Sequence, residues 1–90
     1  MAFISNRSAA ENAIELAEAY QNFLLAFGGR KIETDLTMNN TMMVEILDTY
    51  EVIFSHATYI AGVREAEDKA RAKTLALRLA KQLREVTGEP

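Results

Sequence analysis

The chain of 90 residues offers few side chains that could do chemistry, because it has one histidine, His56, and no cysteine. Ser55 precedes His56, and a serine, a histidine and an aspartate together can form a nucleophilic triad. The surrounding sequence predicts a helix, in which adjacent side chains point about 100° apart, so Ser55 and His56 would not meet. We therefore predict no serine nucleophile and assign His56 to the flank of a helix, at an interface.

Metal and phosphate chemistry are also poorly supported. Zinc sites need cysteines or several histidines, and the di-iron bundle motif needs a glutamate three residues before its histidine, where Ile53 stands. Glu11, Glu15 and Glu18 recur at helical spacing and could hold a divalent cation, but a solvated helix face explains them better. The segment 28–31 is glycine-rich without the spacing or the hydroxyl of a P-loop. We predict no catalytic residue, no metal and no cofactor.

Basic side chains gather near the carboxyl end of the chain. Between Lys69 and Arg84 there are six basic residues and no acidic one, although the whole chain has a net charge of −3. The six are Lys69, Arg71, Lys73, Arg78, Lys81 and Arg84. On a helix they would form a positive face that could bind nucleic acid, but no aromatic residue follows Tyr59 to stack on bases. A solvated face, a nucleic-acid surface and a site for an acidic protein all stay open.

Leu77 interrupts this positive face. It lies between Lys73 and Lys81, with Arg84 nearby at helical spacing. An isolated exposed leucine is common, but an apolar centre with a charged rim is also typical of a small docking site. We predict that Leu77, Lys73, Lys81 and Arg84 bind another protein.

Three helices are expected to position these residues. The first is predicted over 8–27, since Ser8 to Glu11 reads as a capping box and two glycines follow Phe27. Its apolar face is Ala13, Leu16, Ala17, Tyr20, Phe23, Leu24 and Phe27. The others are predicted over 41–60 and 64–86, with a bend near Gly62. A single unbroken helix from 41 to 86 is the alternative.

The middle helix is apolar over an unusually large part of its circumference. One face repeats at three- and four-residue steps and holds Met43, Ile46, Leu47, Tyr50, Ile53, Phe54, Ala57, Ile60 and Ala61. A second line on its flank holds Val52, His56, Tyr59 and Val63. A helix so widely buried needs a second layer of protein. We therefore predict a homodimer formed through Val52, His56, Tyr59 and Val63.

These observations predict one all-α domain over residues 1–90, a three-helix antiparallel bundle assembled as a helical dimer. The apolar runs are too short to cross a membrane, and the lack of cysteine and of a signal segment favours the cytoplasm. We expect a non-enzymatic protein that binds another protein. By analogy alone, it would be an accessory, adaptor or inhibitor protein of the kind that phages and mobile elements encode. The alternative is a nucleic-acid-associated protein that uses the basic face of the last helix.

Overall fold

A computed structural model describes residues 1–88 and shows five strands and two helices. In chain order they are β1 (Ala2–Asn6), α1 (Ala10–Ala26), β2 (Arg30–Ile32), β3 (Asn39–Ile46), β4 (Thr49–His56), β5 (Tyr59–Ala66) and α2 (Lys69–Val86). The strands form one sheet in the order β1-β5-β4-β3-β2, with every neighbouring pair antiparallel. The prediction of an all-α three-helix bundle is therefore wrong.

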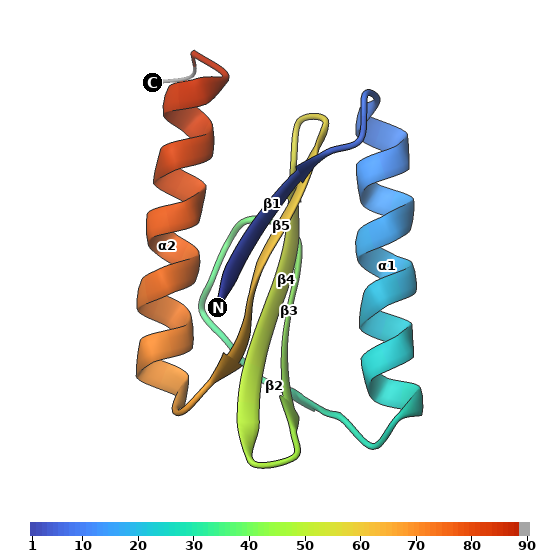
Figure 1. The fold of residues 1–90 in the computed structure, drawn as a ribbon, viewed down its shortest axis with the longest axis vertical. Coiled ribbons are helices and arrows are strands. Elements are labelled where there is room, and N and C mark those ends of the chain that lie inside the picture. Colours follow the sequence, from blue (N-terminus) through green and yellow to red (C-terminus); the bar gives the residue numbers. More distant parts are fainter. Residues whose placement is uncertain (89–90) are drawn as a thin grey trace.

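The sheet is sandwiched between the two helices, with α1 on one face and α2 on the other (Figure 1). The core between α1 and the sheet is formed by Ala17 and Leu24 of the helix and by Val44, Ile53 and Ile60 of the strands. The core between α2 and the sheet includes Leu79 and Leu83 of the helix and Met43, Val52, Phe54 and Val63 of the strands. Strand β4 lies at the centre of the sheet and packs against both helices.

The helix predicted over 41–60 is in fact β3, β4 and the start of β5. A central strand covered on both faces is apolar on both sides, and residues 51–55 are all buried. A continuous apolar run matches helical spacing as well as strand spacing, so the periodicity could not separate the two. The unusual burial that the sequence indicated is real, but it belongs to a sheet between two helices.

The residues at the two hairpin turns also gave little indication of strands. The β3–β4 hairpin turns at Leu47 and Asp48, which have positive φ angles of 50° and 63°, and the β4–β5 hairpin has Ala57 at 51°. Two-residue hairpin turns need such angles and normally use Asn, Asp or Gly to reach them. Leu47 and Ala57 are none of these and Asp48 is not followed by glycine, so the sequence has neither the Asn-Gly nor the Asp-Gly pair that predicts a hairpin.

Helices α1 and α2 lie close to the helices predicted over 8–27 and 64–86, but each starts at a different residue. Ser8 does not cap α1, because its φ is 70° and the N-cap is Ala9, without a side-chain hydrogen bond. At the other end, Gly28 follows α1 with a φ of 96°, the left-handed conformation that closes a helix. Helix α2 starts at Lys69 rather than 64, where the Asp68 carboxylate accepts a hydrogen bond from the Arg71 N–H at 2.8 Å.

Gly62 lies within β5 and neither breaks nor continues a helix, so the bend and the unbroken helix from 41 to 86 are both wrong. A β-carbon there would overlap the carbonyl oxygen of Val52 and lie 2.9 Å from Cε1 of Phe3. Glycine is needed because the neighbouring strand and the ring of Phe3 approach closely. Over residues 1–88, neither helix has the length and apolar character needed to cross a lipid bilayer.

Candidate functional site

The four residues predicted to mediate self-association lie on one face of the sheet, beneath α2. Val52 and Val63 are partners in the β4–β5 ladder and are fully buried. His56 and Tyr59 are partners at the hairpin end and are half-buried, and His56 Nε2 lies 3.2 Å from Thr87 Oγ1. The second layer over this line is therefore α2 of the same chain.

The predicted docking residues lie along the exposed side of α2, where Leu77 is 47% exposed. Leu77 and Arg84 line one shallow hollow of about 260 Å³ together with His56. The Lys73 ammonium instead donates to the Asp35 carboxylate at 2.8 Å, which ties α2 to the segment before β3. Lys81 is exposed. The structure brings Leu77 and Arg84 together and directs Lys73 elsewhere.

A polar cluster with one buried carboxylate lies between α1 and the sheet. The hydroxyl of Tyr20 donates to Glu51 Oε1 at 3.4 Å, and Arg64 Nε lies 3.9 Å from the same oxygen. The Arg64 guanidinium carbon also sits 5.7 Å from the centroid of the Tyr20 ring. Burial raises the pKa of Glu51, and the opposing influence of Arg64 and of the Tyr20 hydrogen bond is smaller.

A carboxyl with a raised pKa can act as a general acid, so Glu51 is the strongest candidate for chemistry in the described residues. A substrate must reach such a carboxyl, however, and the Glu51 side chain is only 6% exposed. Each of the three side chains comes from a different element, α1, β4 and β5. We interpret Glu51, Tyr20 and Arg64 as a structural link that holds α1 on the sheet.

A series of aromatic rings crosses from β1 along α1, and we call Phe3, Tyr20, Phe23 and Phe27 the aromatic ledge. Successive ring centroids are 6.2, 6.4 and 4.5 Å apart, within or near the range of favourable aromatic pairs. Phe3 and Tyr20 are half-buried, whereas Phe23 is 56% and Phe27 67% exposed. The ledge thus begins in the core and ends in solvent.

The apolar spacing predicted that Tyr20, Phe23 and Phe27 share the core face of the first helix with Ala13, Ala17 and Leu24. The structure buries Ala13, Ala17 and Leu24, as predicted, but the fourth buried residue is Gln21 and the three rings lie to one side of this face. Gln21 is the reason for the displaced face, because its amide donates to the carbonyls of Asn40 and Ile53 at 2.6 and 3.2 Å. The aromatic spacing at 20, 23 and 27 was visible, but a buried glutamine was not expected.

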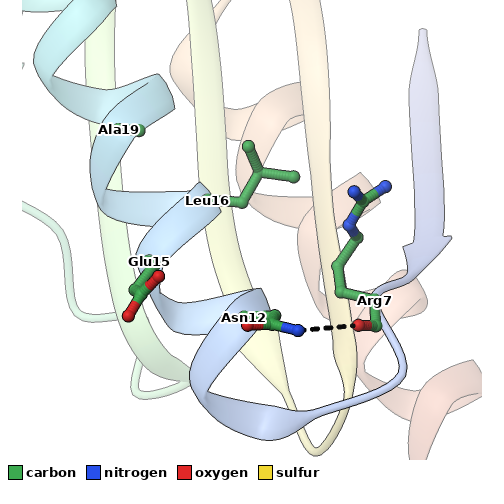
Figure 2. A pocket seen from close by; sticks show the side chains of 5 residues that line it. All are labelled: Arg7, Asn12, Glu15, Leu16 and Ala19. Atoms are coloured by element: carbon green, nitrogen blue, oxygen red, sulfur yellow. Dashed lines mark hydrogen bonds between the residues drawn. The ribbon is translucent and has the colours of Figure 1, made fainter.

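A hollow of about 350 Å³ lies beside the ledge, between α1 and the end of β1. Figure 2 shows Leu16 extending from α1 on the side where Arg7 lies, while the Asn12 amide donates to the Arg7 carbonyl at 3.5 Å. Leu16 is exposed and lies one helical turn before Tyr20. The side of α1 that faces β1 is therefore apolar from Leu16 to Phe27.

Comparison with protein-family models, characterised proteins and solved structures finds no match to this chain. Two exposed surfaces stand out in residues 1–88, the aromatic ledge with Leu16 on α1 and the basic side of α2 around Leu77. The ledge with Leu16 has more exposed apolar side chains than the α2 surface, and the sequence pattern did not predict their exposure.

Proposed function

We propose that this protein is not an enzyme and acts by binding another protein through the aromatic ledge. The observation that carries the proposal is the exposure of Phe23 and Phe27 on a helix that already buries a full core face. Adjacent exposed aromatic rings are costly in water and are enriched where proteins bind one another. These two rings contact Tyr20 and each other but are not part of either buried core. The absence of cysteine fits the cytoplasm, where we place this activity.

The shape of the surface favours a helix as the bound element. Helix α1 packs on β3, β4 and β5, so β1 lies outside its cover on the same face of the sheet (Figure 1). Strands are about 4.8 Å apart and a helix is about 10 Å wide, so a helix bound there would rest partly on β1 and partly on the exposed side of α1. Phe3, Leu16 and Phe23 present apolar side chains along it. A partner helix with one apolar face would cover them.

The experiment is photo-crosslinking in cells with a light-activated amino acid in place of Phe27. We expect a discrete crosslinked protein at position 27, which is lost when Phe23→Ser is added. The same amino acid in place of Leu77 is the matched control, because Leu77 is an exposed apolar residue on the other helix. Crosslinks at position 77 with none at position 27 would contradict the ledge as the binding surface.

The basic side of α2 supports a second candidate, a nucleic-acid-associated protein. Lys69, Arg71, Arg78, Lys81 and Arg84 are all exposed along this helix. Binding through them should weaken steeply as salt is added, because counterions are released from the phosphates. A labelled oligonucleotide tested at low salt against R78Q/K81Q separates the two candidates, since only nucleic-acid binding depends on these charges. No binding at low salt would remove this candidate.

A further inference from the structure

The two edges of the sheet differ in how well they are protected against pairing. Strand β2 forms one edge, has only three residues and carries Arg30 and Lys31. Strand β1 forms the other edge, has five residues, Ala-Phe-Ile-Ser-Asn, and contains no charge, no proline and no bulge. Natural sheets use short strands, charges, prolines and bulges to prevent edges from pairing with another chain. The β2 edge has such protection and the β1 edge has none.

The hydrogen bonds around β1 show which of its backbone groups are free to pair. The Met1 carbonyl accepts from the Arg64 N–H at 2.6 Å, and the Arg7 N–H donates to the Thr58 carbonyl at 2.8 Å. Odd-numbered residues therefore direct their backbone groups toward β5. In an antiparallel ladder this direction alternates along the strand, so Ala2, Ile4 and Asn6 direct theirs outward.

We propose that β1 pairs antiparallel with β1 of a second copy, around a two-fold axis at Ile4. In this register Ile4 lies opposite Ile4, and Ala2 lies opposite Asn6. Every outward-directed residue then meets another outward-directed residue, and each such pair exchanges two N–H···O bonds. The result is one continuous antiparallel sheet of both copies.

The side chains of β1 suit this pairing. Ile4 is 39% exposed and would pack against its own counterpart across the axis. Phe3 would lie opposite Ser5 on the other face of the sheet, and no side chain of the strand is charged. Beyond the strand, Arg7 would lie opposite Met1, whose ammonium group donates to the Arg64 carbonyl of its own chain. A strand whose central residue pairs with itself is self-complementary, as a two-fold interface requires. An uncharged strand also offers nothing to select a charged peptide, which favours a second copy as the occupant.

The proposed dimer has a consequence for the aromatic ledge. A two-fold axis perpendicular to the sheet preserves its faces, so α1 of both copies lies on the same side. Both ledges then flank the strip that contains the paired β1 strands. The assembly would present two binding surfaces on one face, although the pairing itself does not depend on what the ledge binds.

The test is light scattering coupled to size-exclusion chromatography on the wild type and two variants. We expect twice the chain mass for the wild type, the monomer mass for Ile4→Lys, and twice the chain mass for the matched control Leu77→Lys on α2. The circular dichroism spectrum of Ile4→Lys should match that of the wild type, which shows that the variant is folded when its mass is measured. A monomeric wild type, or an Ile4→Lys dimer, would overturn the proposal.

Amide hydrogen exchange on the wild type tests the register without any substitution. The N–H groups of Ile4 and Asn6 should exchange at least tenfold more slowly at a concentration where the dimer forms than at one where it dissociates. The N–H of Leu77, on α2, is the internal control and should not respond to concentration. A dimer in which Ile4 and Asn6 exchange at the same rate at both concentrations would contradict pairing through β1.

Discussion

The ring of Phe3 lies directly over Gly62, at a point where a β-carbon would come within 2.9 Å of the ring. This contact brings the edge strand β1 down onto β5 and lets Phe3 stack with Tyr20 at 6.2 Å between centroids. The absence of one side chain on β5 thus determines where the aromatic ledge begins.

Replacing Gly62 with alanine should destabilise the fold by about 2–3 kcal/mol, in the upper part of the usual range for overpacking, because the β-carbon would meet the Val52 carbonyl oxygen as well as the ring of Phe3. Urea unfolding measures the change. Gly28→Ala is the matched control, because nothing lies within 4 Å of its β-carbon position and its cost comes only from a φ of 96°. The near-ultraviolet signal of Tyr20 should change for Gly62→Ala alone. An equal cost and an unchanged Tyr20 signal in both variants would contradict the close approach of Phe3.

A better turn sequence between β3 and β4 should stabilise the fold. Leu47 and Asp48 both have positive φ angles, and Leu47 is 89% exposed, so its side chain loses little packing when replaced. Replacing the pair by Asn-Gly, the preferred sequence for such a turn, should raise the free energy of unfolding by about 1 kcal/mol. Thermal unfolding checks this. A lower melting temperature would mean that Leu47 makes a contact that its exposure does not show.

The buried carboxyl of Glu51 should make stability depend on pH. Burial raises its pKa in the folded protein above the usual 4.5, so the folded state holds the proton more tightly than the unfolded state. The stability due to the protonated form is fully present below pH 4.5 and is lost as the pH rises through the raised pKa.

Glu51→Gln removes this titration, so the comparison between the two proteins isolates it. The stability of the wild type relative to Glu51→Gln should fall as the pH rises from 4.5 and then level off. Asp35 should make stability depend on pH in the opposite direction, because the hydrogen bond from Lys73 lowers its pKa. Both proteins contain Asp35, so its contribution cancels in the difference between them. A difference between the two that does not change with pH would show that the Glu51 pKa is not raised.

The exposed rings should contribute little to folding. Phe27→Ser should lower the free energy of unfolding by no more than about 1 kcal/mol, the order of its one ring contact with Phe23. Leu24→Ala, three residues earlier on the buried side of α1, should cost about 2–4 kcal/mol. Chemical denaturation of both variants gives the comparison. A large cost for Phe27→Ser would mean that the ring serves the fold and not a partner.

The sequence carried enough information to find the two helices but not the sheet. Gly28 ends α1 because a left-handed residue is needed there, and the leucines of α2 repeat on one face, so both helices could be located. In β4, the consecutive apolar residues Val52, Ile53 and Phe54 are buried on both faces of the sheet, and such a short continuous run fits a strand and a helix equally well. The turn at Leu47 and Asp48 also lacks the Asn-Gly or Asp-Gly pair that predicts a hairpin.

The candidate site was missed for a related reason. Tyr20, Phe23 and Phe27 were assigned to the core because apolar residues usually face inward. Gln21 lies on the buried side of α1, where its amide donates hydrogen bonds to the carbonyl of Asn40 in β3 and to the carbonyl of Ile53 in β4. Such partners exist only once the sheet has formed, so no local pattern around Gln21 could have revealed them.

The most direct test of the proposed function compares photo-crosslinking at positions 27 and 77 in the same cells, at matched expression. We predict a protein crosslinked at position 27 that disappears with Phe23→Ser and persists with R78Q/K81Q. Crosslinks confined to position 77, or a crosslink at position 27 that survives Phe23→Ser, would contradict binding through the aromatic ledge.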